Sequence, residues 1–251
     1  MITYHGETDV GKRRPLNEDA IFTGNDLFIV CDGMGGHKAG EVASKVATDA
    51  IAAFVKRSGD DPEITWPYGF EPHTSHDGNR LRTAIKLANR AVFSRSASSD
   101  EYTGMGTTVA AVLVSRSRPQ MTYATVGDSR IYLIRGGAIL QLTRDDTWLN
   151  VAWDGEALDS STQASMKNVL TKALGSRQDV DFDVLGGELN DRDIVLLCSD
   201  GLTNMLSDAE IVEIVTAHEA DLERACRQLI AVANAQGGRD NISAVLVRYT
   251  A

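Results

Sequence analysis

The 251-residue chain has little of what marks a secreted, membrane-bound or nucleic-acid-binding protein. Its three cysteines are too few for a disulfide framework, and we expect Cys31, Cys198 and Cys226 to be buried free thiols. No apolar stretch reaches the roughly 18 residues of a membrane-spanning helix, and residues 1–19 contain no apolar core of signal-peptide length. Basic residues number 25 against 35 acidic ones, which argues against a nucleic-acid-binding face. These absences predict a cytoplasmic protein with neither a membrane nor a nucleic acid as partner.

Two catalytic motifs are also missing. No Gly-Lys-Ser/Thr sequence follows the glycine-rich stretch near residue 33, so this stretch is not a Walker-type phosphate loop. A cysteine-based phosphatase needs an arginine six residues after its nucleophile, but the residues at those positions are His37, Asn204 and Val232. There is no internal repeat and no convincing linker, so we expect residues 1–251 to form a single domain.

Apolar residues recur at helical spacing in four segments. The helix that starts at Ser207 opens with a capping box, which Glu210 completes. The other three helices are expected over residues 41–57, 78–97 and 219–236.

Short apolar runs over residues 121–126, 130–135 and 138–142 predict strands. The turns between them are too short for parallel crossovers, so they predict an antiparallel meander. Residues 58–77 are rich in proline and are expected to form a surface loop, and residues 145–165 a mobile flap with a short helix. Strands that alternate with pairs of helices favour an α+β fold with helices outside antiparallel sheets.

Acidic residues recur where apolar, strand-like runs begin or end. One such residue would be an ordinary turn residue. Several of them at strand ends predict a pocket of hard oxygen ligands for divalent cations. These residues are Asp19, Asp32, Asp128, Asp200 and Asp240.

Individual motifs leave alternatives open. Asp32 can bridge two cations, and Gly33 lets its carbonyl approach a metal, but the same sequence also fits a glycine-rich turn before a helix. Arg14 suits a substrate phosphate because a guanidinium matches two phosphate oxygens, whereas an exposed ion pair is the simpler interpretation. Beside it, Glu18 and Asp19 could orient metal-bound waters.

The motifs follow one another in an order found in a known family. The ordered set, rather than any one motif, carries the similarity: residues 14–19, 32–37, 106–108, 126–130, 142–145, 170–175, 199–202 and 240–242. Over nearly its whole length, the chain resembles the metal-dependent protein phosphatases of the PP2C (PPM) family, in their short bacterial form.

The resemblance implies a four-layer α-β-β-α sandwich, in which two central antiparallel sheets are flanked by helix pairs. It implies two Mn²⁺ or Mg²⁺ ions between the sheets and a third-metal position at Asp128, and it places a flap at about 145–175. Asp32 would bridge the two ions, Gly33 would bind one through its carbonyl, and Arg14 would bind phosphate. The implied metal ligands, direct or through water, are Asp32, Gly33, Asp200, Asp240, Glu18, Asp19 and Asp128.

The implied reaction is direct attack of a metal-bridging hydroxide on the phosphorus of phosphoserine or phosphothreonine. The protein would be a monomer that reverses Ser/Thr kinase signalling, with phosphoproteins and a kinase among its partners. Met34, rather than a histidine, follows Asp32-Gly33, so His37 is a candidate proton donor, with a solvent-facing ring as the alternative. Two other functions stay open: a pseudophosphatase that only binds, and a phosphatase of small phosphoesters.

Overall fold

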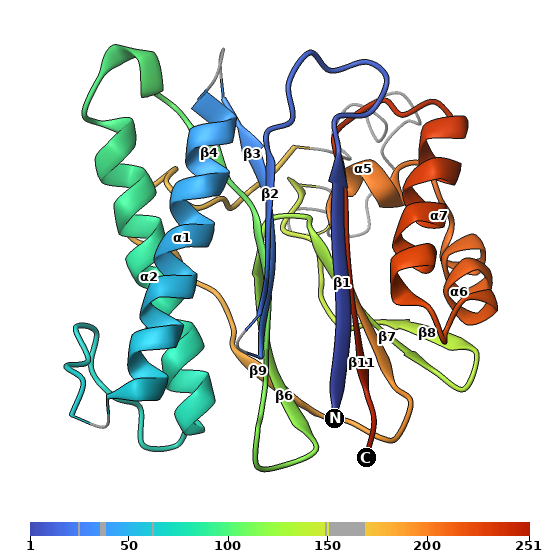
Figure 1. Ribbon diagram of the computed structural model, residues 1–251. Coiled ribbons are helices and arrows are strands. Elements are labelled where there is room, and N and C mark those ends of the chain that lie inside the picture. Colours follow the sequence, from blue (N-terminus) through green and yellow to red (C-terminus); the bar gives the residue numbers. More distant parts are fainter. Residues whose placement is uncertain (25, 36–38, 62, 149, 151–168) are drawn as a thin grey trace.

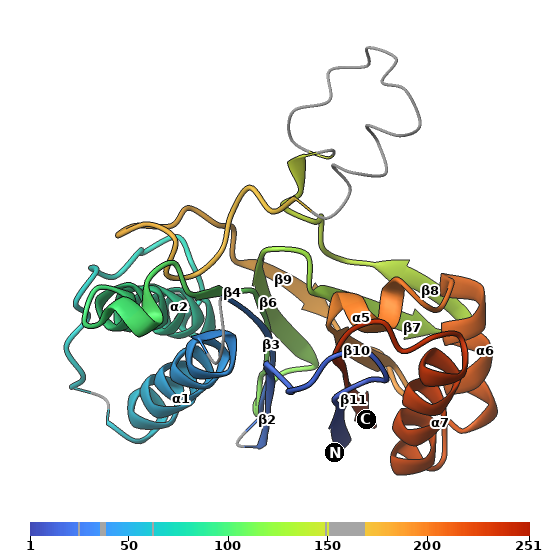
Figure 2. The same cartoon turned by 90° about the horizontal axis from the view of Figure 1, so that it is seen from above.

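The computed structural model describes residues 1–24, 26–35, 39–61, 63–148, 150 and 169–251. Two antiparallel sheets lie face to face, and helices cover the outer face of each sheet (Figure 1). Viewed from above, the layers follow the order helices, sheet, sheet, helices (Figure 2). The four-layer α-β-β-α sandwich predicted from the sequence is therefore confirmed.

The first sheet has five strands in the order β1-β11-β10-β7-β8, and every pair in it is antiparallel. Because β1 and β11 are neighbours, the two ends of the chain lie close together (Figure 1). The strands are β1 (Ile2–Asp9), β7 (Arg130–Arg135), β8 (Ala138–Gln141), β10 (Ile194–Cys198) and β11 (Ile242–Tyr249).

The second sheet has the order β2-β3-β5-β6-β9, and a short strand β4 pairs with the end of β3. The apolar run at the start of β3 is buried on both faces, as expected for a strand covered by helices on one side and by a sheet on the other. The strands are β2 (Asp19–Gly24), β3 (Leu27–Met34), β4 (Gly106–Thr107), β5 (Val109–Val114), β6 (Gln120–Val126) and β9 (Leu185–Glu188).

Helices α1 and α2 pack on the second sheet, and α5, α6 and α7 pack on the first. Among the described residues, none of the helices combines the length and apolarity that crossing a bilayer requires. The helices are α1 (Ala39–Asp60), α2 (His76–Ser96), α5 (Asp200–Thr203), α6 (Asp208–Ala217) and α7 (Leu222–Ala235), with a 3₁₀ turn η1 (Asp100–Tyr102).

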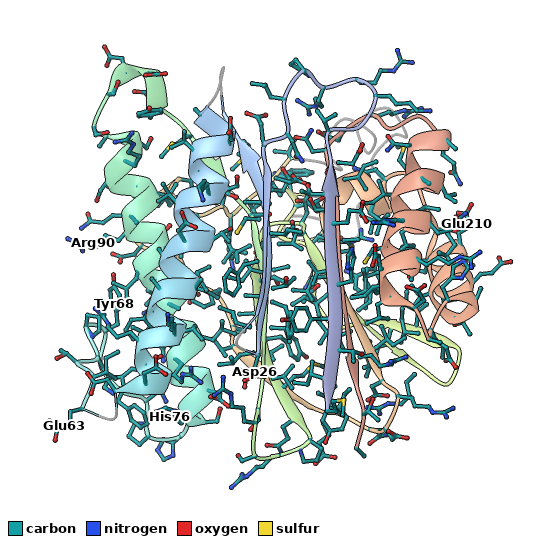
Figure 3. All side chains as sticks on the ribbon, viewed as in Figure 1. Asp26, Glu63, Tyr68, His76, Arg90 and Glu210 are labelled. Carbon is teal, nitrogen blue, oxygen red and sulfur yellow. The ribbon has the colours of Figure 1, made fainter. Side chains whose placement is uncertain are left out.

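The side chains of β3 alternate between two cores. Leu27, Ile29 and Cys31 join the core under α1 and α2. Phe28 and Val30 point the other way, into the core between the sheets, which Figure 3 shows filled with side chains. Because this alternation has a period of two, the next residue of the Phe28–Val30 row is Asp32, which is thereby directed between the sheets.

The helix predictions need small corrections at their ends. The helix predicted over 41–57 extends over 39–60, because the Ser58 hydroxyl and Arg80 both donate to the carbonyl of Val55 near its end. The predicted surface loop at 58–77 is correspondingly shorter. The helix predicted from 219 begins at Leu222, where the Asp221 side chain caps it.

The capping box at the start of α6 is present as predicted. The Glu210 carboxylate accepts a hydrogen bond from the backbone N–H of Ser207 at 2.8 Å, and the Ser207 hydroxyl accepts one from the backbone N–H of Glu210 at 3.4 Å. Hydrogen bonds that its carboxylate accepts, first from the Ser207 hydroxyl at 2.7 Å and then from the Ser207 backbone N–H, lower the pKa of Glu210. Figure 3 shows this residue on the outer side of the helix layer.

The predicted meander of three strands is wrong in its pairing. The strands exist, but β6 belongs to the second sheet, whereas β7 and β8 form a hairpin in the first. Residues 127–129 are therefore no hairpin turn; they carry the chain from one sheet to the other. Gly127 adopts a φ of +101°, which a residue with a side chain rarely adopts, and this conformation makes so short a passage feasible.

Candidate metal centre and active site

A cavity of about 560 Å³ lies where one end of each sheet meets the turns beside it. Its walls carry seven of the nine site residues predicted from the sequence. Asp19 lies behind the wall, and His37 and most of the predicted flap, residues 149 and 151–168, lie outside the described residues. The seven are Arg14, Glu18, Asp32, Gly33, Asp128, Asp200 and Asp240.

Asp19 and Asp32 are brought together by strand pairing. They are directly opposite each other in the antiparallel ladder of β2 and β3, so their side chains share one face of the sheet. Two like charges in this arrangement repel each other. A pair of carboxylates at this position therefore requires a proton or a cation close by.

Asp19 also links the two sheets. Its Oδ2 accepts hydrogen bonds from the hydroxyl of Ser199 at 2.8 Å and of Ser243 at 2.6 Å, and both serines belong to the first sheet or its ends. The period of two explains this contact, because Val195 and Leu197 of β10 face the core between the sheets and Ser199 continues their row.

The backbone of Asp32 is held by two threonines. Its N–H donates to the Thr108 hydroxyl at 2.9 Å, and its carbonyl accepts from the Thr107 hydroxyl at 2.9 Å. The Thr108 hydroxyl also contacts the hydroxyl of Ser129 at 2.7 Å. Ser129 follows Asp128, so one threonine connects the main chain beside Asp32 to the passage that carries Asp128.

Close packing of glycines places Glu18 beside Gly33. The N–H of Gly33 donates to the Glu18 carbonyl at 3.1 Å. A Cβ on Gly33 would lie 2.1 Å from the carbonyl oxygen of Gly40, and one on Gly40 would lie 2.5 Å from Oε1 of Glu18. Any side chain at either position would separate the start of α1 from the end of β3.

Asp200 and Asp240 are neighbours for a similar reason. A Cβ on Gly201 would lie 1.9 Å from the carbonyl oxygen of Asn241, so the start of α5 touches the turn before β11. Asp240 accepts a hydrogen bond from Nη2 of Arg14 at 2.7 Å, and both side chains remain partly exposed. Asn204 donates to Oδ2 of Asp200 at 2.9 Å.

Burial and mutual repulsion raise the pKa values of Asp19, Asp32 and Asp128. Burial is the main cause for Asp19 and Asp128, and it raises the pKa of each to about 7. The pKa of Asp32 is raised well above its usual range by burial, and then by Asp19 and Asp200. The pKa of Arg14 is raised by its hydrogen bond to Asp240. A bound divalent cation would favour the ionised carboxylates and oppose these shifts.

The donor set fits Mn²⁺ or Mg²⁺. Glu18 Oε1, Asp19 Oδ1 and Asp200 Oδ1 are buried and have no hydrogen-bond partner among the described residues, which is costly unless a ligand satisfies them. Every side-chain acceptor named here is an oxygen, the donor that these cations prefer. Within the described part of the chain, no three His, Cys, Asp or Glu side chains are positioned to bind one metal ion together. The carboxylates therefore line the cavity without surrounding a single metal position.

The sequence did not reveal the residue that fixes the segment carrying Arg14 and Glu18. Asn241, only 5% exposed, accepts a hydrogen bond from the Glu18 N–H and donates to the carbonyls of Val10 and Leu16, each at 2.9 Å. In the sequence, Asn241 stands out only as the neighbour of Asp240. Nothing in its local sequence indicates these partners, which lie more than 200 residues away.

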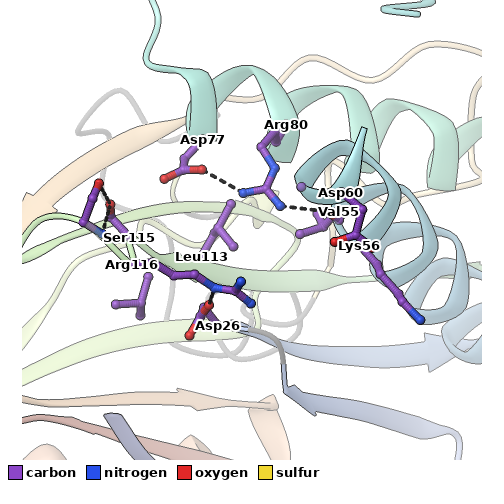
Figure 4. A pocket seen from close by; sticks show the side chains of 12 residues that line it. Asp26, Val55, Lys56, Asp60, Asp77, Arg80, Leu113, Ser115 and Arg116 are labelled. Atoms are coloured by element: carbon purple, nitrogen blue, oxygen red, sulfur yellow. Dashed lines mark hydrogen bonds and ion pairs between the residues drawn. The ribbon is translucent and has the colours of Figure 1, made fainter. Parts of the chain in front are cut away.

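A second cavity, of about 270 Å³, lies at the start of β3, the opposite end of the strand from Asp32. Figure 4 shows two ion pairs in it, Arg116 with Asp26 and Arg80 with Asp77, beside the charged side chains of Lys56 and Asp60. None of the carboxylates that line it has a buried oxygen without a partner among the described residues. This contrast favours the larger cavity as the functional site.

Comparison with known proteins identifies the family of the chain. The family model described as Protein phosphatase 2C matches residues 12–247. The chain is 35% identical over 252 residues to the serine/threonine phosphatase stp of Listeria monocytogenes, over 96% of this chain and 93% of the relative.

Two solved structures are similar throughout. The serine/threonine phosphatase PstP/Ppp of Mycobacterium tuberculosis has a TM-score of 0.84 at 31% identity, over 100% of this chain and 99% of that one. The catalytic domain of serine threonine protein phosphatase PstP in complex with two manganese ions has a TM-score of 0.82 at 30% identity, with the same coverage. The chain therefore belongs to the protein phosphatase 2C family.

Proposed function

We propose that this protein hydrolyses phosphoserine and phosphothreonine in phosphoproteins, with Mn²⁺ or Mg²⁺ bound in the larger cavity. One observation carries the proposal. Buried carboxylate oxygens without partners, contributed from both sheets, lie at the same cavity as the guanidinium of Arg14. A cavity with this composition can hold cations and a phosphate at the same time.

The chain supplies the ligands as follows. Asp32 and the carbonyl of Gly33 would hold cations on the side of the second sheet, and Asp200 and Asp240 on the side of the first. Asp128, with Asp200, would hold a third ion. Glu18 and Asp19 would act through water, since Asp19 lies behind the cavity wall. The bound cations would activate the attacking water and neutralise phosphate oxygens.

Arg14 would bind the substrate phosphate. Its guanidinium now pairs with Asp240, and about half of its side chain is exposed, so it can turn toward a phosphate without first being uncovered. Its charge and planar fork suit two equatorial phosphate oxygens. If cations engage Asp240, its attraction for Arg14 weakens, and the arginine becomes available to the substrate.

We propose that residues 1–251 form a single domain, in which residues at about 145–175 act as a flap, and that the protein is a cytoplasmic monomer which opposes a Ser/Thr kinase. Three buried free thiols are compatible with a reducing compartment. We keep His37 as a candidate proton donor. The relatives compared above are named serine/threonine phosphatases, which makes a phosphatase of small phosphoesters or a pseudophosphatase the weaker proposal.

The test is metal-dependent hydrolysis. We expect the purified protein to hydrolyse p-nitrophenyl phosphate with Mn²⁺ and to lose this activity in EDTA. Among phosphopeptides, it should prefer those with phosphothreonine over those with phosphotyrosine. Asp32→Asn should lose at least about 100-fold in kcat, because Asp32 lies among the proposed ligands. Asp49→Asn, an exposed position on α1, is the matched control. Full activity in excess chelator, or in the Asp32 variant, would contradict the proposed metal-dependent hydrolysis.

A further inference from the structure

One wall of the larger cavity carries a cation that has no carboxylate partner in the part of the chain that the structure describes. The rim segment, residues 170–177, contributes both Lys172 and Arg177 to this cavity. Lys172 pairs with Asp146 at 3.4 Å. The Arg177 side chain is exposed, and among the described residues it makes neither an ion pair nor a hydrogen bond. By contrast, Arg14 forms an ion pair with Asp240, and Arg130 forms one with Asp145.

The backbone at Arg177 is nevertheless fixed. Asn89 of α2, only 2% exposed, donates to the carbonyls of Arg177 at 3.1 Å and Gln178 at 2.9 Å, and it accepts from the N–H of Gly175 at 2.8 Å. Gly175 has a φ of +86°, and a Cβ there would lie 2.3 Å from Val92. Buried hydrogen bonds of this kind hold a loop in place at the cost of its freedom.

The rim segment is also tied to the metal centre. Leu174 exchanges two backbone hydrogen bonds with Thr107, at 2.8 and 3.1 Å, and Thr107 holds the carbonyl of Asp32. Arg177 is therefore an exposed cation whose main chain is positioned relative to the proposed cation site. An arginine held this way suits an anion that lies beside the phosphate being cleaved.

We propose that Arg177 is a specificity-determining residue that binds an anionic side chain close to the phosphorylated residue of the substrate, and that Asn89 positions it. The inference rests on the proposed function. The net charge of the chain, −10, repels an acidic substrate at long range. A cation at the rim of the cavity offers the anionic side chain beside the phosphate an attractive partner, in addition to Arg14, Lys172 and the cations proposed to bind the carboxylates.

The experiment compares phosphothreonine peptides that differ only in their flanking residues: aspartate, alanine, lysine or a second phosphoserine. We expect the wild type to show the highest kcat/KM on the two anionic peptides. Arg177→Ala should lower the ratio of kcat/KM between the aspartate and alanine peptides by about threefold to tenfold, chiefly through KM. Arg177→Glu should reverse the preference in favour of lysine.

Controls separate this role from general damage. Arg118→Ala removes an exposed arginine outside the cavity, between β5 and β6, and should keep the wild-type ratio. Asn89→Ala should lower the ratio as Arg177→Ala does. Asn79→Ala, on the same helix, deletes an equally buried asparagine that holds residues 71–75, and it should lower the melting temperature without changing the ratio.

The outcomes are distinct. If the wild type hydrolyses the peptides and Arg177→Glu keeps the wild-type ratio, the specificity role is wrong while the proposed function stands. If the wild type hydrolyses none of the peptides and no p-nitrophenyl phosphate with Mn²⁺, both fall. If only the doubly phosphorylated peptide responds to the Arg177 variants, the anion that Arg177 recognises is a second phosphate rather than a carboxylate.

Discussion

Gly201→Ala sets two physical effects against each other. Gly201 lies in the short helix α5, where alanine is intrinsically favoured over glycine by about 1 kcal/mol. The added Cβ, however, would lie 1.9 Å from the carbonyl oxygen of Asn241. Ordinary van der Waals contact begins at 3.4 Å, so the two backbones would have to separate by about 1.5 Å. Overpacking of this kind typically costs about 1–3 kcal/mol, which outweighs the helix preference.

The same separation acts on the proposed site. Asp200 precedes Gly201, and Asp240 precedes Asn241, so the clash pushes apart two residues proposed to share a cation. A misplacement of about 1 Å in an active site can cost about 100-fold in rate. We therefore expect Gly201→Ala to lose up to about 2 kcal/mol of stability, about 100-fold in kcat, and affinity for Mn²⁺.

Urea denaturation and calorimetric titration of Mn²⁺ would measure the first and last effects, and hydrolysis of p-nitrophenyl phosphate the second. The matched control is Gly186→Ala in β9, where the nearest atom to the new Cβ lies 3.8 Å away and the residue is exposed. The control should match the wild type in all three measurements. A Gly201→Ala protein with raised stability and normal turnover would show that propensity decides the outcome, and would refute the close contact.

Three further predictions concern the same region. Arg14→Lys keeps the charge but loses the planar fork, so kcat/KM for p-nitrophenyl phosphate should fall about tenfold, and an unchanged value would remove Arg14 from phosphate binding. In the metal-free protein, Asp19 and Asp128 keep their protons up to a pH of about 7, whereas in the unfolded chain they lose them near the ordinary pKa of 3.8. The free energy of unfolding should therefore fall as the pH rises from 4 to 7, by up to about 1.4 kcal/mol per pH unit for each group. Bound Mn²⁺ should abolish this fall. A rise in stability over that range, measured by urea denaturation, would contradict the raised pKa values. Asn241→Ala and Asn79→Ala each delete a buried asparagine with at least three hydrogen bonds, so both should lose about 2–4 kcal/mol, but only the Asn241 variant should lose turnover at a temperature where both remain folded.

The periodicity of the sequence predicted the four longer helices to within a few residues, because helical spacing of apolar residues is a local pattern, but it did not predict the short helix α5. Strand partners are different. Residues 121–142 read locally as a continuous meander, yet the passage at Gly127 and Asp128 changes sheets instead of making a hairpin. A short turn excludes a parallel crossover, but it does not choose between a neighbour in the same sheet and one in the facing sheet. That choice depends on tertiary packing, which the local pattern does not contain.

The carboxylates were predictable for a reason that strand geometry explains. Asp32 follows Phe28 and Val30 at a period of two, so any model that places those residues between the sheets also places Asp32 there. The same rule applied to Val195 and Leu197 predicts the position of Ser199, but only once the first sheet is known to lie on the second. The sequence therefore indicates where Ser199 lies along its strand, but it does not show that Ser199 binds Asp19.

In two carboxylates of this site, one oxygen accepts hydrogen bonds from the surrounding fold and the other accepts none among the described residues. At Asp19, Oδ2 accepts hydrogen bonds from the hydroxyls of Ser199 and Ser243, whereas Oδ1 is buried and has no hydrogen-bond partner among the described residues. At Asp200, Asn204 binds Oδ2, and Oδ1 again lacks a partner. A carboxylate that served only as a structural hydrogen-bond acceptor would gain by satisfying both oxygens. One oxygen held by the fold and one left without a partner is the arrangement expected of a ligand that must be in place before its cation arrives.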